Sequence, residues 1–194
     1  MKTASRYEPA CRTVEEIAPA KVNLILSVGK KREDGYHDLL TLMETVSLCD
    51  KLTFQVENSI LPEIKLSICG KYPVPEDPSN LVIRSAEAFF ARIGRRFSLS
   101  VRLEKNIPTE AGLGGGSADA AATLRALNRI AGDPISSDEL CDLAATLGAD
   151  VPFCLFGGTA ICRGIGEIME TIDRPARRFY AVVMGKDRVS TSGA

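Results

Sequence analysis

The most informative segment of the chain runs from Asn106 to Arg129 and reads NIPTEAGLGGGSADAAATLRALNR. Four glycines stand just before a run rich in alanine, at Gly112, Gly114, Gly115 and Gly116. Because glycine has no Cβ, such a loop adopts positive φ angles and brings its backbone N–H groups close to a bound group. A helix that begins there points unpaired N–H groups and the positive end of its dipole at the loop, which favours phosphate. The segment therefore predicts an anion-binding loop between a strand and a helix.

The helix after this loop is predicted to have Ser117 as its N-cap, because serine caps well and the following alanines favour helix. A second helix is predicted from a capping box at Ser136 and Glu139, with Gly148 at its end. The helix after the glycine loop is expected to bury residues at helical spacing, namely Ala120, Ala121, Leu124, Leu127 and Ala131.

Three common glycine motifs are excluded because each requires a residue that this segment lacks. A nucleotide-binding P-loop needs Lys after the last glycine, where Ser117 stands. The dinucleotide fingerprint needs Gly or Ala at the same place, and the nucleophile elbow of hydrolases needs Gly where Asp119 stands. The segment is therefore either a phosphate loop of another kind or a flexible glycine turn before an ordinary helix.

Composition and charge are those of an ordinary globular protein. The 194 residues are 45% hydrophobic and 25% charged, with a net charge of -1, so bulk charge argues for neither nucleic acid nor a membrane surface as a partner. The first twenty residues hold no apolar run, so we expect no signal peptide and a cytoplasmic location. A plastid precursor without its transit peptide would have the same appearance.

Six cysteines are present, and we expect them to be reduced and mostly buried. The chain is too long and apolar to need disulfide bonds, and no Cys-x-x-Cys pair occurs. The six positions are Cys11, Cys49, Cys69, Cys141, Cys154 and Cys162.

The segment from Ile17 to Val28 alternates with a period of two and is predicted to be a strand. Lys21, Asn23 and Ser27 share one face of it. A solvated polar face explains this alternation as well as a ligand-binding face does. The opposite face is apolar and contains Val22, Leu24, Leu26 and Val28.

The remaining pattern mixes strands and helices and indicates an α/β (α+β) protein without internal repeats. Asp150 is expected in a turn, where Asp more often caps the local backbone than acts as a base. The other expected elements are strands over Leu39–Val56 with a turn at Cys49–Lys51, a strand at Ile64–Ile68, a helix from Asn80 to Gly94, a strand at Phe97–Leu103, and short strands near Thr159–Arg163, Glu167–Thr171 and Phe179–Met184.

The only histidine, His37, lies in a charged turn beside Tyr36. A single His is more often structural or exposed than catalytic. With one His and no triad order, hydrolysis by a Ser-His-Asp triad has little support.

The glycine segment also resembles the phosphate loop of a known family. Residues 108–121 fit the pattern Pro-x-x-x-Gly-Leu-Gly-Gly-Gly-Ser-x-Asp-Ala-Ala, which is similar to that of the GHMP kinases, a family of small-molecule ATP-dependent kinases. Three further segments agree in order and spacing with one branch of this family: Pro19–Leu24, Asp34–His37 and Leu147–Pro152.

The resemblance implies a fold like domain 2 of ribosomal protein S5. It implies a tail at residues 1–16, an ATP- and substrate-binding domain at 17–188, and at 189–194 the start of a C-terminal domain that this chain lacks. Members of this family continue for roughly another domain. A homodimer is compatible with the apolar inter-domain surface that such a chain would expose.

The resemblance also implies roles for particular residues. Lys21 and Asp150 fall on the catalytic pair, and Asn23, Tyr36 and His37 on the substrate side. Phosphoryl transfer needs a carboxylate for the hydroxyl proton and positive donors for the transferring group, which suits the pair. Ser117 would contact Mg²⁺ that arrives with ATP. The implied ATP-binding residues are Asn80, Lys105, Pro108, Gly112, Leu113, Gly114, Gly115, Gly116, Ser117 and Ala118.

The implied reaction is ATP-dependent phosphorylation of the 2-hydroxyl of a cytidine diphosphate-linked methylerythritol in non-mevalonate isoprenoid biosynthesis. The alternatives are a GHMP kinase acting on homoserine, mevalonate or a sugar, and a non-catalytic module that binds nucleotide or nucleic acid. Neutral net charge argues against nucleic acid. We expect neither nucleic acid nor a membrane as a partner.

Two carboxylates depart from the expected pattern. Glu110 enters the loop where small or apolar residues are commoner, and its charge would repel a triphosphate unless it points away or toward Mg²⁺. The carboxylate of Asp119, just inside the helix, would repel a triphosphate in the same way. We interpret it as a partner of the helix dipole.

Overall fold

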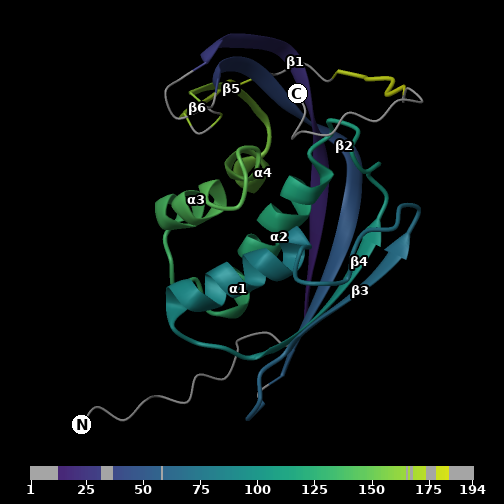
Figure 1. The fold of residues 1–194 in the computed structure, drawn as a ribbon, viewed down its shortest axis with the longest axis vertical. Coiled ribbons are helices and arrows are strands. Elements are labelled where there is room, and N and C mark those ends of the chain that lie inside the picture. Colours follow the sequence, from purple (N-terminus) through teal and green to yellow (C-terminus); the bar gives the residue numbers. More distant parts are fainter. Residues whose placement is uncertain are drawn as a thin grey trace.

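The computed structural model describes residues 13–31, 37–57, 59–164, 166, 168–173 and 178–183. Within these ranges one sheet is packed against a layer of helices (Figure 1). In chain order the elements are β1 (Thr13–Lys31), β2 (His37–Glu57), β3 (Ile64–Gly70), α1 (Leu81–Ile93), β4 (Ser98–Lys105), α2 (Gly115–Ile130), α3 (Ser137–Ala145), α4 (Val151–Phe156), β5 (Thr159–Gly164) and β6 (Ile168–Thr171).

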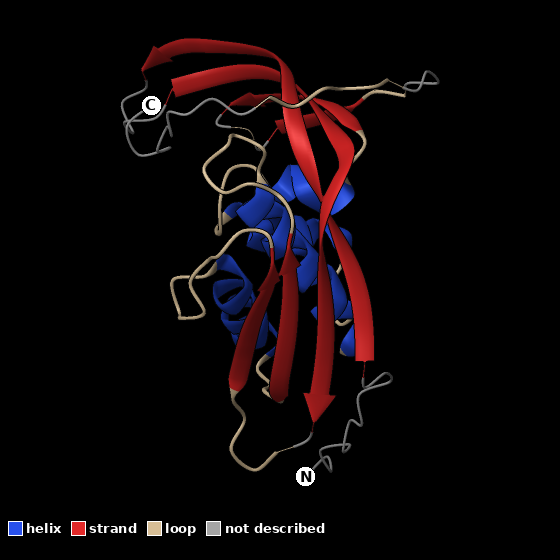
Figure 2. Cartoon of the chain, turned by 90° about the vertical axis from the view of Figure 1, so that its right-hand side faces the viewer, coloured by secondary structure: helices blue, strands red, loops and turns tan. Residues whose placement is uncertain are grey.

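The sheet is organised around β2, which is long enough to serve two sets of neighbours. The strand order is β3-β4-β2-β5-β6, and β1 pairs with the other edge of β2 along almost its whole length. β4 pairs with residues 51–57 of β2 and β5 with residues 39–44, while β3 and β4 form the only parallel pair among the described strands. Figure 2 shows the strands in front and the helices behind them, so one face of the sheet is uncovered.

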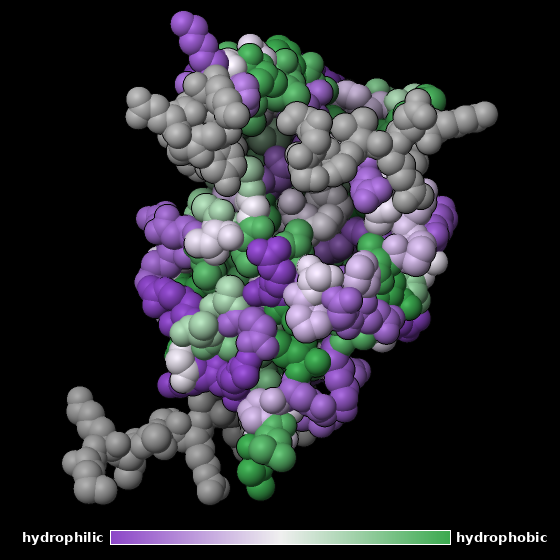
Figure 3. Space-filling model, viewed as in Figure 1, coloured by the Kyte–Doolittle hydropathy of each residue, from purple (hydrophilic) through white to green (hydrophobic). Residues whose placement is uncertain are grey.

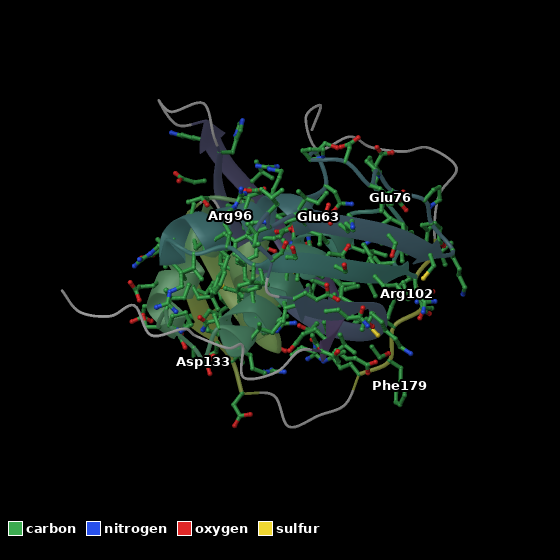
Figure 4. The ribbon with its side chains drawn as sticks, turned by 90° about the horizontal axis from the view of Figure 1, so that it is seen from below. Glu63, Glu76, Arg96, Arg102, Asp133 and Phe179 are labelled. Carbon is green, nitrogen blue, oxygen red and sulfur yellow. The ribbon has the colours of Figure 1, made fainter. Side chains whose placement is uncertain are left out.

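The core lies between this sheet and α2. Small alanines let the helix approach the strands closely, and the larger apolar side chains fill the space on either side. In β4, Val101 and Leu103 point into this core, whereas Arg102 between them lies on the uncovered face of the sheet (Figure 4). The five residues predicted for the buried face of the helix, Ala120, Ala121, Leu124, Leu127 and Ala131, are all buried.

Helix ends predicted from the sequence are mostly confirmed. Asn80 caps α1 by accepting a hydrogen bond from the N–H of Val82 at 2.9 Å, and Gly94 ends the helix in the left-handed conformation. α3 begins with the predicted capping box between Ser136 and Glu139. It ends at Ala145 rather than at Gly148.

Three predictions about secondary structure are wrong. No turn interrupts β2 at Cys49–Lys51, because Asp50 points into the protein and its carboxylate binds buried donors. The turn expected around Asp150 ends sooner than its predicted bounds, Ala149–Pro152, because the short helix α4 begins at Val151, with Pro152 in its first turn. The described residues of the expected strand near Phe179–Met184, residues 179–183, form none.

The apolar face predicted for the first strand is not buried along its whole length. Leu26 and Val28 are more than half exposed, as is Ile25 beside them. Figure 3 shows hydrophobic side chains gathered over the upper ends of β1 and β2, where the two strands bend past the helical layer. The helices end before this part of the ribbon and do not cover it.

Among the described residues five cysteines are free, and only Cys154 and Cys162 are buried, so the expectation of mostly buried thiols holds for two of the five. Burial raises the pKa of the Cys154 thiol to about 12, which keeps it protonated. No helix in the described part of the chain has the length and apolar character needed to cross a membrane.

Gly70→Ala is expected to lower the free energy of unfolding by about 2–5 kcal/mol. Gly70 has φ 101°, and a Cβ there would lie 2.5 Å from the backbone oxygen of Lys105 and 2.6 Å from its nitrogen. Gly94→Ala is the matched control, because Gly94 also has positive φ but open space around it. We expect about 1–2 kcal/mol for the control from backbone strain alone. Equal losses for the two variants in chemical denaturation would show that the close contact is unimportant.

Candidate functional site

A pocket of about 410 Å³ lies where the glycine loop meets β1 and the start of α1. The loop supplies one wall, and Val74, Pro75 and Leu81 supply an apolar surface beside it. Lys21 and Asp150 stand at the pocket as well. The lining contains nine of the ten residues that the resemblance assigns to ATP: Asn80, Lys105, Pro108, Gly112, Leu113, Gly114, Gly115, Gly116 and Ser117. Ala118, the tenth, is buried in α2 behind them.

The loop is held directly against β1. The N–H of Lys21 donates to the carbonyl oxygen of Leu113 at 2.9 Å. A Cβ on Gly114, where φ is 66°, would lie 2.9 Å from Cγ of Lys21, so glycine lets the lysine side chain pass beneath the loop. The site thus depends on Gly114 for steric as well as conformational reasons.

Ser117 is not the N-cap of the helix, contrary to prediction. α2 begins at Gly115 with Gly114 as its N-cap in the left-handed conformation, and Ser117 is the third helical residue. The glycines that were expected to form only loop therefore extend the helix toward the pocket. The first-turn N–H groups are consequently those of Gly115, Gly116 and Ser117, all of which line the pocket.

Lys21 and Asp150, the two residues that the resemblance assigns to the catalytic pair, lie side by side at the pocket. Nζ of Lys21 lies 3.2 Å from Oδ2 of Asp150 and 2.6 Å from Oδ1 of Asn23. The Lys21 side chain is 8% exposed and that of Asp150 33%, so the carboxylate is the part that a substrate can reach. Asp150 immediately precedes α4.

Lys105 forms a buried ionic network with Asp50 and Asp119 below the loop. Its ammonium group donates to Asp119 at 2.6 Å and also to Asp50. Asp50 in addition accepts from the backbone N–H groups of Asn106 and Ile107. The network ties β2, the end of β4 and the N-terminal part of α2 together at the pocket.

Asp119 is part of this buried network rather than a partner of the helix dipole, which corrects the prediction. Burial raises the pKa of its carboxyl to about 8, against the lowering effect of Lys105, and the neighbouring Asp50 raises it further. Asp119 is therefore largely protonated at neutral pH. A neutral side chain also removes the expected repulsion between Asp119 and an anion in the pocket.

The contacts of the other predicted site residues do not point to a ligand. Asn80 has a full structural role, since it caps α1 and donates to the carbonyl oxygen of Pro75 at 2.7 Å. His37 is exposed at the start of β2, with Nδ1 3.1 Å from the carbonyl oxygen of Gly29, and is not among the lining residues. Tyr36 lies outside the described residues. Glu110 is exposed at the pocket, with φ 56°.

Asp50 was missed as a residue that supports the site, although a signal for it was present. It has the same parity along β2 as Leu52, Phe54 and Val56, which are all buried. A period of two therefore places Asp50 on the core face. Reading Cys49–Lys51 as a turn concealed this.

Arg125 was also missed, and it connects the elements that carry Lys21 and Asp150. From α2 its guanidinium donates to the C-terminal carbonyls of α4, at 2.8 Å for Cys154 and 3.3 Å for Leu155. It donates as well to the carbonyl oxygen of Ile17 in β1 and pairs with Glu16. A helical arginine on an alanine-rich helix gives no sequence signal of such contacts.

The donor set suits a magnesium ion that is brought by a phosphate ligand. Among the described residues no three His, Cys, Asp or Glu side chains are grouped to hold a metal ion. Mg²⁺ commonly binds through one or two protein oxygens together with substrate phosphates and water. Ser117 and the carboxylates of Glu110 and Asp150 supply such oxygens at the pocket.

Comparison with known proteins gives a consistent set of relatives. Residues 80–158 match the family model described as GHMP kinases N terminal domain. A 4-diphosphocytidyl-2-C-methyl-D-erythritol kinase of Geobacter metallireducens is 41% identical over 175 residues, which cover 90% of this chain and 61% of that protein. The protein of the same name in Geobacter sulfurreducens is also 41% identical, over 90% of this chain and 62% of its own length. The chain thus spans less than two thirds of these relatives.

Solved structures agree in fold. A crystal structure of 4-(cytidine 5'-diphospho)-2C-methyl-D-erythritol kinase superimposes with a TM-score of 0.71 at 41% identity, covering 84% of this chain and 56% of that one. A homoserine kinase from Cytophaga hutchinsonii superimposes with a TM-score of 0.67 at 20% identity, covering 88% and 54%. The second similarity concerns the fold alone.

Proposed function

We propose that this chain, which has the fold of the GHMP kinase N-terminal domain, transfers the γ-phosphate of ATP to the 2-hydroxyl of 4-diphosphocytidyl-2-C-methyl-D-erythritol, a step of non-mevalonate isoprenoid biosynthesis. The observation that carries the proposal is the Lys21–Asp150 ion pair beside the glycine loop. A phosphate loop and a partly exposed carboxylate in one pocket are what phosphoryl transfer to an alcohol requires. The relatives at 41% identity bear the name of that kinase.

The pocket suits a nucleotide. The first-turn N–H groups of α2 and its positive dipole end favour the phosphates. The apolar surface of Val74, Pro75 and Leu81 suits the flat face of a base. ATP bound in this way would extend from the apolar surface toward Lys21 and Asp150.

Asp150 is assigned as the group that accepts the proton of the acceptor hydroxyl. As the proton leaves, the hydroxyl oxygen forms a bond to the γ-phosphorus, and the bond from that phosphorus to the bridging oxygen of ADP breaks. Lys21 supplies positive charge beside the reacting oxygens, and Asn23 holds Lys21 through its amide oxygen. Ser117, together with Glu110, would hold Mg²⁺, which when bound neutralises phosphate charge.

The proposal is tested by isothermal titration of the chain with MgATP and with the cytidine-linked substrate, alongside an assay of ADP release. We expect saturable binding of both ligands and ADP release that depends on the cytidine-linked alcohol. Homoserine and mevalonate are the comparison acceptors, because kinases of this fold act on different alcohols. ADP release with either of these, and none with the cytidine-linked alcohol, would overturn the substrate assignment.

Binding without transfer would have a different meaning. Binding of MgATP in the titration, with no ADP release in the presence of any acceptor, would leave this chain as a nucleotide-binding module. Absence of MgATP binding by a chain shown to be folded by circular dichroism would contradict the proposal altogether.

A further inference from the structure

The hydroxyl group of Thr41 lies behind the Lys21–Asp150 pair and is hydrogen-bonded on both sides. It donates to the carbonyl oxygen of Ile25 at 2.8 Å and accepts from Nδ2 of Asn23 at 2.7 Å. Thr41 is only 2% exposed, so water does not compete for these bonds. The contacts form a chain from β2 through Asn23 to Lys21.

The single proton of this hydroxyl determines which way the Asn23 amide faces. A threonine hydroxyl has one proton to donate and lone pairs to accept with. The carbonyl oxygen of Ile25 has no proton to give, so it takes the proton of Thr41, and only a lone pair is left for Asn23. The amide NH₂ of Asn23 must therefore face Thr41, and its Oδ1 must face the other way.

Lys21 requires the same orientation from the other side. Its ammonium group has donors only and lies 2.6 Å from Oδ1 of Asn23. A reversed amide would set the NH₂ group against the ammonium, with donors facing donors. The hydrogen bonds to Thr41 and to Lys21 therefore require the same orientation of the Asn23 amide, and each bond stabilises it.

An irregularity in the sheet makes the Thr41 contact available. The pairing of β1 with β2 shifts register between Asn23 and Ile25. Ordinary antiparallel pairing satisfies backbone carbonyls with backbone N–H groups. At this shift the side chain of Thr41, on β2, reaches the carbonyl oxygen of Ile25 on β1.

We propose that Thr41 is a positioning residue, whose hydroxyl fixes the Asn23 amide so that its oxygen holds the Lys21 ammonium beside Asp150. The proposal deepens the proposed function and rests on it, because it matters only if Lys21 and Asp150 are the reacting pair. Thr41 itself is buried and is not among the residues that line the pocket.

The first test compares Thr41→Val with Thr41→Ser in steady-state transfer assays. Valine has nearly the shape of threonine but no hydroxyl, whereas serine keeps the hydroxyl. We expect kcat to fall about tenfold to 100-fold in Thr41→Val, with KM for MgATP changed less than about twofold, since the Asn23 amide that holds the charged Lys21 loses its own anchor. Thr41→Ser should restore kcat to within about threefold of the original. Equal kcat in the valine variant and the unmodified chain would overturn the proposal.

A double-mutant cycle separates positioning from general loss of stability. If Thr41 acts through Asn23, then adding Thr41→Val to Asn23→Ala lowers kcat by less than about twofold further. Full additivity of the two losses would contradict action through Asn23. Thr123→Val is the matched control, because it removes another buried hydroxyl, bonded to the carbonyl oxygen of Asp119 in α2. The control should lose stability but keep kcat.

A measurement without turnover makes the test independent of the proposed reaction. Hydrogen exchange of the Asn23 side-chain NH₂, followed by NMR in the free chain, should be about threefold to tenfold faster in Thr41→Val than in Thr41→Ser. Equal exchange in the two variants would overturn the positioning role even in a chain that transfers no phosphate. Absence of transfer from the unmodified chain would count against the proposed function, and the exchange result would still decide on Thr41.

Discussion

Replacing Asp150 by Asn is expected to lower the single-turnover rate of phosphoryl transfer by about 10²–10⁴-fold, the range usual for loss of a general base. Asparagine has nearly the same shape but cannot accept the proton of the acceptor hydroxyl. MgATP binding should change little, because the glycine loop and the apolar surface beside it remain. Rapid-quench measurement of labelled phosphate transfer, with titration of MgATP on the same sample, separates the two effects.

Controls for this experiment come from the chain itself. Asp142→Asn makes the same chemical change at an exposed position in α3 and should leave the rate unchanged. Lys21→Met removes the cation of the pair, and the double variant with Asp150→Asn should lose little more than the worse single variant, because groups that act as a unit are not additive. A rate for Asp150→Asn within threefold of the original would exclude Asp150 as the base.

Local signals predicted much of this fold. The caps at Asn80 and Gly94 and the capping box at Ser136 involve neighbours in sequence, so the residue types alone reveal them. The alternation that put Lys21 and Asn23 on one face of a strand is confirmed by their hydrogen bond. These features depend on backbone geometry within a few residues, which the sequence expresses directly.

Features that depend on distant partners were not predictable in this way. Asp50 resembles a turn residue until its donors, more than fifty positions later, are known to be buried beside it. Ser117 is a strong N-cap by type, but Gly114 takes that position because the loop must pass over Lys21. Whether Leu26 is buried depends on what covers the upper end of β1, which periodicity does not specify.

Asp50→Asn is expected to lower the free energy of unfolding by about 3–5 kcal/mol at pH 7, whereas Asp119→Asn should raise it by up to about 4 kcal/mol, because the variant takes up no proton on folding. Asp50 accepts hydrogen bonds from the Lys105 ammonium and two backbone N–H groups, the environment of an ionised carboxylate. Its amide would leave Lys105 without a balancing charge in the core. Protonated Asp119 already resembles asparagine in shape and charge, so its replacement keeps the contacts of the folded state and removes only the cost of proton uptake. Urea denaturation at pH 7 measures both.

The dependence of stability on pH provides the sharper form of this prediction. Because the folded chain keeps the Asp119 proton up to about pH 8, while the unfolded chain loses it near the ordinary value of 3.8, the folded state binds more protons between these limits. The free energy of unfolding should therefore fall as pH rises from about 4 to 8, by up to about 1.4 kcal/mol per pH unit. Asp119→Asn should flatten this slope.

Measurements between pH 5 and 8 avoid the other shifted groups of the described chain. The exposed carboxylates with lowered pKa values, Asp77 and Glu139, titrate below this window, and the Cys154 thiol titrates above it. A slope that persists unchanged in Asp119→Asn would show that Asp119 is ionised in the folded chain. Asp119 would then bring a negative charge next to the phosphate loop, and Lys105 would have to balance two carboxylates. A flattened slope would mean instead that the buried proton lets an acidic residue lie near the start of α2 without repelling a nucleotide.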